Sequence, residues 1–423
     1  MTASPSDPTR LSALDAAYLA VGRRRQQVNS PTFVIEVAGS APEQDTLLDH
    51  VSQCVARMPR LRQRVRRSGL GLRRPLWVED VSFVLEQHVG VKHVQNEDEL
   101  RMVVDQCLSE PIDLDKPPWD LRLVTGHSTS GFVLLLRVHH AVGDGDALVN
   151  QVLAEFFKSR DDPPILLAPG HRISRRRDAV LGLAELLADT TRRPAPRVAE
   201  LNGPLGTDRH LHWSTSSVRD YAVAAERHGG SINDIFLTAL GGALRDWLGA
   251  RQLPLPADLA VGVPVNLRSH REAGALGNRL AGFRLHLPLG PSDPTRRHVL
   301  VLGRMQALKS GRQLEGAMLE AELSRLVPTP FLGTSMRLRF SRRVVNLMAS
   351  NIAGPSRPAT FIGRRVVSIV PGPPLPPRHR LIAQMSTYAN TVSVAVVADS
   401  SVGDADAIVA SIGEHVSRLV GDQ

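Results

Sequence analysis

One short segment restricts the fold of this chain more than any other. The stretch Phe132–Val138 is apolar apart from Arg137, and His139 and His140 follow it directly. An apolar run of this length that ends at a glycine-containing turn predicts a central strand buried on both faces. A helix is expected after the turn, over Ala147–Phe157. The sequence therefore predicts a mixed α and β core that carries a reactive pair of residues at a strand end.

The remaining elements predict two globular halves joined by a connector. We place the first half at residues 1–168, the connector at 169–210 and the second half at 211–423. The connector is rich in arginine and proline and contains the turn signal Asn202-Gly203-Pro204. Helices are expected at Ser12–Val21, Asp45–Met58, Glu97–Leu108 and from Ser231 onward, and strands at Thr32–Val37, near 76–91, and at Ala260–Val263, Phe283–Leu287, Ile382–Tyr388 and Val392–Val397.

Three segments carry more specific expectations. Val180, Leu183, Ala184 and Leu187 fall at helical spacing, which predicts an amphipathic helix packed on a domain surface by that stripe. Pro371–Pro377 predicts an exposed loop. Arginines interleave with apolar residues over Met336–Met348, and as a helix this composition fits either a membrane surface or a basic helix packed on the domain.

The formal net charge of +9 and a pI near 10.4 favour anionic partners such as phospholipid, nucleic acid or the phosphates of coenzyme A. Aromatic residues make up only 4 % of the chain and show no stacking pattern with the basic residues, so a nucleic-acid partner is not expected. The basic run Arg60–Arg74 is a candidate for contact with coenzyme A phosphates or lipid headgroups.

Targeting and membrane-spanning signals are missing from the sequence pattern. The segment Met1–Arg10 has no apolar region typical of a signal peptide, and no run approaches the roughly 18 apolar residues of a span. Cys54 and Cys107 lack metal-ligand or redox spacing and are expected to be reduced thiols. These features predict a cytoplasmic protein that would reach lipid from the membrane surface.

The segment His139-His140-Ala141-Val142-Gly143-Asp144-Gly145 holds the residues best suited to chemistry. A neutral imidazole can accept a proton near pH 7, so one histidine is a candidate general base. Successive strand residues point to opposite faces, so the two rings are not expected to share a cavity. Asp144 could hold an imidazole tautomer directly, or lock the loop by pairing with an arginine elsewhere.

Other chemistries fit the residues less well. A metal site would need a second cluster of ligands beside the histidines, and the sequence offers none. A nucleophilic triad lacks its Gly-x-Ser-x-Gly elbow, and neither a phosphate-binding loop nor a dinucleotide fingerprint is present. A purely structural role for the two histidines stays open on the residues alone. We expect no metal and no bound cofactor.

At this point the sequence resembles the bacterial wax ester synthase/acyl-CoA:diacylglycerol acyltransferases, relatives of chloramphenicol acetyltransferase and of peptide-synthetase condensation domains. The His-His-x-x-x-Asp-Gly segment carries the resemblance together with blocks along nearly the whole chain. Two blocks depart from the family pattern, since Pro118 replaces leucine and Ala353 replaces proline. The similar blocks are Leu11–Tyr18, Pro117-Pro118-Trp119, Ile232-Asn233-Asp234, Val263–Arg268, Gly277-Asn278 and Asn351–Pro355.

The resemblance implies an α/β (α+β) fold of two chloramphenicol-acetyltransferase-like domains with a tunnel between them. His140 would be the catalytic base, with His139, Asp144 and Gly145 beside it. Acyl-CoA would be the cosubstrate, and diacylglycerol or a fatty alcohol the acceptor, at a membrane or lipid-droplet surface. The residues implied to bind substrate are Pro117, Trp119, Asn233, Asp234, Asn266, Asn351, Gly354 and Pro355.

Several of these assignments have structural alternatives. Ser231-x-x-Asp234 matches a helix capping box, so Asp234 can serve as a cap alone. Pro117-Pro118-Trp119 can anchor a loop by burying an indole. For the whole chain, two further functions stay open: an acyltransferase or condensation enzyme acting on a carrier-bound or natural-product alcohol, and a lipid-binding relative without turnover.

Overall fold

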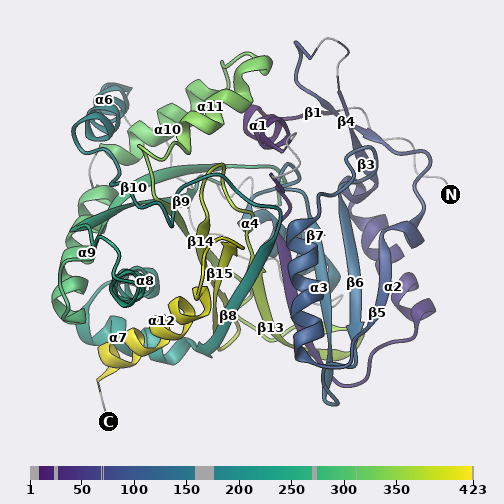
Figure 1. Cartoon of the computed structure of the whole chain (residues 1–423). Coiled ribbons are helices and arrows are strands. Elements are labelled where there is room, and N and C mark those ends of the chain that lie inside the picture. The colour runs from purple at the N-terminus through teal and green to yellow at the C-terminus, as the bar shows by residue number, and fades with distance from the viewer. Residues whose placement is uncertain are drawn as a thin grey trace.

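Two six-stranded sheets covered by helices lie side by side in the computed structural model (Figure 1). The structure describes residues 9–22, 27–67, 69, 71–157, 176–268, 274–310 and 312–421. Strands and helices mix in both parts, so the expected α/β class is confirmed.

The first sheet has the strand order β12-β13-β2-β7-β6-β5. Only β5 and β6 run parallel in it. The central strand β7 is buried from Phe132 to Val138, as its apolar sequence predicts. Helix α3, Glu97–Ser109, packs its apolar face against β2, β6 and β7. The strands are β2 Thr32–Ala38, β5 Val89–His93, β6 Trp119–Thr125, β7 Gly131–Val138, β12 Thr360–Phe361 and β13 Arg364–Gly372.

The second sheet has the order β10-β9-β11-β14-β15-β8, and β9, β11 and β14 run parallel in it. Helices α7, α8, α9 and α12 supply apolar side chains to the core on one of its faces. The strands are β8 Arg209–Ser217, β9 Asp258–Asn266, β10 Leu280–Pro288, β11 Leu347–Ala353, β14 Leu381–Tyr388 and β15 Thr391–Asp399. The helices are α7 Val218–His228, α8 Ile232–Ala250, α9 Pro294–Ser310 and α12 Ala405–Val420.

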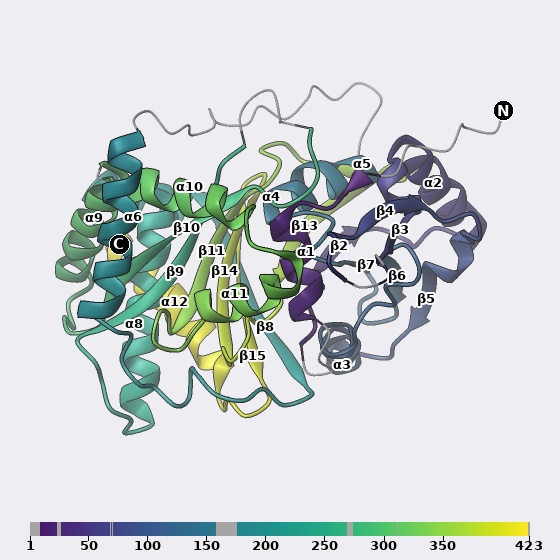
Figure 2. The ribbon, with the colours of Figure 1, turned by 90° about the horizontal axis from the view of Figure 1, so that it is seen from above.

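The remaining elements lie around the sheets. Strands β1, β4 and β3 form a small third sheet. Helices α1, α10 and α11 lie along one side of the molecule, with α6 beside α10 (Figures 1 and 2). Their bounds are β1 Thr9–Arg10, α1 Ala13–Val21, α2 Gln44–Arg57, β3 Gln63–Arg66, β4 Leu76–Glu79, α4 Gly145–Ala147, a π-helix at Leu148–Leu153, α5 Ala154–Phe157, α6 Arg176–Arg192, α10 Gln313–Ser324 and α11 Leu332–Arg339.

A segment from late in the sequence belongs to the sheet of the first half. Strands β12 and β13 come late in the sequence, yet β13 pairs with β2 and completes the first sheet. The expected assignment of all of 211–423 to a second domain is therefore wrong for this segment. Val370 of β13 packs in one apolar cluster with Val34 and Leu135 of the first sheet and Ile382 and Ala395 of the second. This cluster joins the two sheets into one body.

Most predicted elements are confirmed, with three corrections. Helix α6 buries Ala179 and Gly182, while Val180 and Leu187 of the expected packing stripe are exposed. The reason is a close crossing at which Gly182 meets α10 through backbone atoms. Helix α6 therefore packs through its small residues.

The other two corrections concern Pro371–Pro377 and Met336–Met348. Pro371 is the last residue but one of strand β13, pairs with Phe33 and is buried, so this segment does not begin as an exposed loop. Proline is tolerated there because the strand ends shortly afterwards. The second segment is not one helix, since α11 ends at Arg339 and β11 begins at Leu347.

Candidate active site

The predicted reactive segment leaves the end of strand β7 and remains in register with both neighbours. The backbone N–H of His139 donates to the carbonyl of Pro118 at 2.9 Å, and that of His140 donates to Asn29 at 2.8 Å. Gly143 then pairs with Gly277 of the second half in an isolated parallel bridge. The segment is thus fixed from both halves of the molecule.

His139 is a buried neutral group. Its ring nitrogen Nδ1 accepts a hydrogen bond from the backbone N–H of Ala141 at 3.1 Å. Burial, with a smaller effect from the neighbouring His140, lowers the pKa of His139 from 6.5 to about 3. At neutral pH this ring therefore holds the turn and carries no charge.

His140 has a different environment, as the strand alternation predicts. Its ring stacks on Tyr18 of α1, with centroids 3.9 Å apart and planes inclined by 10°. Nδ1 is buried without a hydrogen-bond partner, although it lies near the carbonyl of its own residue, while part of the residue stays accessible to solvent. Burial lowers the pKa of His140, partly offset by Asp144. The ring is therefore neutral at pH 7.

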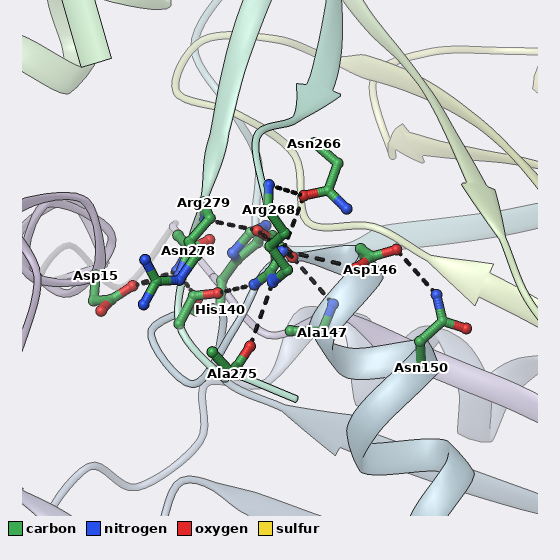
Figure 3. Close-up of polar contacts among 12 residues, drawn as sticks. Asp15, His140, Asp146, Ala147, Asn150, Asn266, Arg268, Ala275, Asn278 and Arg279 are labelled. Atoms are coloured by element: carbon green, nitrogen blue, oxygen red, sulfur yellow. Dashed lines mark hydrogen bonds and ion pairs between the residues drawn. The ribbon is translucent and has the colours of Figure 1, made fainter. Parts of the chain in front are cut away.

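The backbone of His140 is tied to helix α1 through two asparagines. The side chain of Asn278 donates both to the carbonyl of His140 and to a carboxylate oxygen of Asp15, each at 2.7 Å (Figure 3). Asn29, whose carbonyl accepts from His140, donates its side-chain amide to the carbonyl of Tyr18 at 2.7 Å. Helix α1 thus fixes the backbone of His140 as well as its ring.

Asp144 locks the loop by pairing with an arginine, the second of the two predicted alternatives. Nη1 of Arg268 lies 2.6 and 2.8 Å from its two carboxylate oxygens, and both side chains are buried. The backbone N–H groups of Ala147 and Arg279 donate to the same carboxylate (Figure 3). None of the hydrogen bonds within the described residues joins Asp144 to the ring of His140. A buried pair satisfied in this way holds the turn rigidly.

Gly145 packs closely against strand β11. A Cβ atom there would lie 2.3 Å from Cδ1 of Ile352, on β11. The next turn carries Asp146, which accepts from the side chain of Asn150 at 3.0 Å; burial raises the pKa of Asp146. Asn150 also donates to the carbonyl of Ala353 at 3.0 Å. The block Asn351–Pro355 is thus brought beside the segment that follows the histidines.

Two of the three asparagines predicted to contact substrate lie at the carboxyl ends of neighbouring parallel strands. Asn266 ends β9, and Asn351 lies near the end of β11. Both residues are exposed. Gly354 follows and donates its N–H to the carbonyl of Thr387 at 3.0 Å, and Pro355 accepts from Ala389. No hydrogen bond within the described residues joins either asparagine to His140.

Two other predicted blocks have structural roles. Trp119 is buried and donates its indole N–H to the carbonyl of Leu61 at 2.7 Å, and Pro117 is buried next to it. Asp234 forms a complete capping box with Ser231 at the start of α8. Asn233 lies beside it, and no contact within the described residues links this helix end to His140. These positions match the anchor and cap alternatives.

Arg268, Asn278 and the α1 residues Asp15 and Tyr18 were not predicted as site residues. All four did lie inside blocks that carry the family resemblance, namely Leu11–Tyr18, Val263–Arg268 and Gly277-Asn278. Only the three-dimensional contacts identify their roles. Among the residues that the structure describes, no three histidine, cysteine, aspartate or glutamate side chains gather as metal ligands. The tunnel between the halves stays a prediction.

Comparison with known families decides the class of the protein. Residues 11–200 match the wax ester synthase/diacylglycerol acyltransferase catalytic domain, and residues 276–419 match the C-terminal domain of the same family. The chain belongs to this family. It is accordingly an O-acyltransferase, and the matched catalytic domain contains the whole His139–Gly145 segment.

Individual relatives agree with this assignment. The probable diacylglycerol O-acyltransferase tgs1 of Mycobacterium tuberculosis is 27 % identical over 97 % of this chain and 95 % of its own length. The wax ester synthase/diacylglycerol acyltransferase of Marinobacter aquaeolei superposes with a TM-score of 0.68 at 19 % identity, covering 97 % of this chain and 98 % of that one. The first condensation domain of the calcium-dependent antibiotic synthetase gives 0.69 at 16 % identity, with 98 % and 96 % coverage. The fold is shared across these acyltransferases and condensation domains.

Proposed function

We propose that this acyltransferase moves a long-chain acyl group from acyl-CoA to diacylglycerol, or to a fatty alcohol, with His140 as the general base. The observation that carries the proposal is the state of the His140 ring. It is neutral, fixed on Tyr18, and held at the meeting point of the two halves with one nitrogen, Nδ1, buried. Nε2 is then the nitrogen left to take a proton from a substrate.

The proposed reaction has two proton transfers. An alcohol is a weak nucleophile until its proton is removed, so His140 accepts that proton as the hydroxyl oxygen attacks the thioester carbon. A C–O bond forms, the C–S bond breaks, and the protonated His140 returns the proton to the sulfur of coenzyme A. This route uses neither a metal nor a covalent acyl-enzyme.

The tetrahedral oxyanion needs hydrogen-bond donors. Asn266 and Asn351 are the side chains we propose for this role, because both are exposed at the strand ends that meet the catalytic segment. Asp144 supports the reaction indirectly, since its pair with Arg268 fixes the turn that carries His140.

We propose diacylglycerol as an acceptor because the name of the mycobacterial relative specifies it. Acceptors of this kind are insoluble in water. Within the described residues, no helix is both long and apolar enough to cross a bilayer. We therefore propose that the protein meets its acceptor as a peripheral protein at a membrane or lipid-droplet surface.

The test is an acceptor panel with one radiolabelled acyl-CoA and diacylglycerol, hexadecanol or a carrier-bound alcohol. His140→Ala is expected to lower the rate with the preferred acceptor by about 10²–10⁴-fold, the usual value of general-base assistance. His127→Ala, a change in the β6–β7 turn, is the matched control and should keep full activity. Circular dichroism verifies that both variants fold. Undiminished transfer by a folded His140→Ala variant would show that His140 is not the base.

A further inference from the structure

The end of α10, the turn after it and helix α11 present apolar side chains to solvent. Leu326 is 76 % exposed, Phe331 62 % and Leu338 67 %. Phe331 immediately precedes α11 and Leu338 lies within it, and a spacing of seven residues, two helical turns, places them on the same side. We call these three residues, together with Arg325, Arg342 and Arg343, the α11 surface.

These apolar groups are not needed by the core of the protein. Helix α11 already buries Leu332, Gly333 and Met336 on its other side, and Gly333 packs against Ala20 of α1. An apolar side chain left in water gains nothing for folding, and three of them exposed within the stretch Leu326–Leu338 fit an interaction site. The outer side of α11 therefore fits a partner outside this chain.

The charged residues of this region are all positive. The stretch Leu323–Arg343 contains five arginines and no carboxylate, and the next acidic residue along the chain is Asp399. Arg339 pairs with Glu320. Of the ion pairs formed by the described residues, none includes Arg325, Arg342 or Arg343. The uncompensated cations favour an anionic partner.

A surface pocket adjoins the end of α11. It is lined by Arg342 and Arg343 together with Pro194–Arg197. The backbone of the two segments is joined there, since the N–H of Ala195 donates to the carbonyl of Arg343 at 2.9 Å. Three arginines line this one pocket, which suits a phosphate, because each guanidinium can form two parallel hydrogen bonds with its oxygens.

We propose that the α11 surface docks on an anionic phospholipid surface. Leu326, Phe331 and Leu338 would enter the boundary between headgroups and acyl chains, while the arginines bind headgroup phosphates. A partner with both an anionic and an apolar layer satisfies both kinds of side chain at once. The inference gives a definite location to the peripheral association proposed above, and its test does not depend on acyl transfer.

The location suits the chemistry. Helix α11 packs on α1, and α1 carries Tyr18 and Asp15, which hold His140 (Figures 1 and 2). A bilayer against the outer side of α11 would therefore lie one helix away from the catalytic segment.

The test is co-sedimentation of the full chain with vesicles of phosphatidylcholine alone or with phosphatidylglycerol added. We expect binding to the anionic vesicles that weakens as salt is raised. Arg342→Gln with Arg343→Gln should lower partitioning roughly 25-fold, since each arginine near an anionic surface contributes roughly fivefold. Leu326→Ser, Phe331→Ser and Leu338→Ser together should lower binding to the same vesicles at least as much. All five residues are exposed or partly solvated, so the fold should persist.

The matched control carries Val81→Ser, Met102→Ser and Lys92→Gln, exposed residues of the other half. It should bind vesicles like the wild type. Acyl transfer to a water-soluble short-chain alcohol should be equal in all variants, which separates this inference from the proposed function. Wild-type-like vesicle binding by the α11 variants, or equal binding to neutral and anionic vesicles, would overturn the proposal. The proposal would also be overturned if sedimentation showed that the α11 variants lose a dimer while they still bind vesicles.

Discussion

The ring of His140 lies against Tyr18, a residue 122 positions earlier in the chain. Stacked aromatic pairs contribute about 0.5–1.5 kcal/mol beyond their buried area. The contact is between the faces of the two rings, so we expect the ring of Tyr18 to be the part that orients the imidazole. We therefore expect that removing this ring contact lowers the turnover number of the enzyme.

Replacing Tyr18 tests this role. We expect Tyr18→Leu to lower kcat by about 3- to 10-fold, the range that corresponds to one aromatic contact. Tyr18→Phe keeps the ring and should stay within about twofold of the wild type on the same scale. Both kcat and KM should be measured, with the loss expected in kcat. Equal losses in the two variants would assign the effect to the hydroxyl group.

Protonation of buried histidines should make the protein sensitive to acid. The folded state keeps His139 neutral down to about pH 3, whereas the unfolded chain takes up a proton below its ordinary pKa of 6.5. The unfolded state thus binds more protons between these values, so stability falls as pH drops through that window and is unaffected above it.

This predicts a lower free energy of unfolding at pH 5 than at pH 7.5, by about 2 kcal/mol for one such histidine. Urea titrations at the two pH values measure it. Burial also lowers the pKa of His379, so its effect has the same sign. His139→Asn should reduce the difference between the two pH values. A difference unchanged in that variant would show that His139 already protonates in the folded state.

At the scale of elements, helices α6 and α10 cross through two glycines. A Cβ atom on Gly316 would lie 2.3 Å from the backbone of Gly182, so neither position has room for a side chain. The backbones touch, and the crossing depends on the absence of both side chains.

Gly316→Val should therefore separate the helices and lower the free energy of unfolding by about 1–3 kcal/mol, the usual cost of overpacking. Gly303→Ala in α9 is the matched control, because no atom lies within 4 Å of its added methyl group. It should stabilise the protein by up to about 1 kcal/mol. Urea denaturation of both variants measures the difference, and equal stability of Gly316→Val and wild type would contradict the crossing.

The same crossing shows why sequence periodicity failed to predict which side of α6 is buried. Val180 and Leu187 predicted the packed side of α6, but a helix that meets its neighbour through glycine turns its larger residues outward. The continuous apolar run did identify β7 and the helical spacing did identify α8, because their apolar residues fill a core that accepts large side chains. Local pattern predicts burial well only where side-chain volume drives the packing.

At the scale of the molecule, the catalytic segment was identifiable in sequence and its supports were not. His139, His140 and Asp144 form one local pattern, whereas Arg268 and Asn278 act from the other half. Contacts across more than 120 residues leave no periodic trace in a single sequence. The pairing of β13 with β2 was missed for the same reason.

That late strand has a consequence for synthesis of the protein. The partner of Phe33 is Pro371, so the first sheet lacks two of its strands until 372 of the 423 residues have left the ribosome. Until then β2 has an open edge, which is prone to pairing with other chains. A nascent chain of this kind should rely on chaperones for most of its translation, and a truncated first half should aggregate when it is expressed alone.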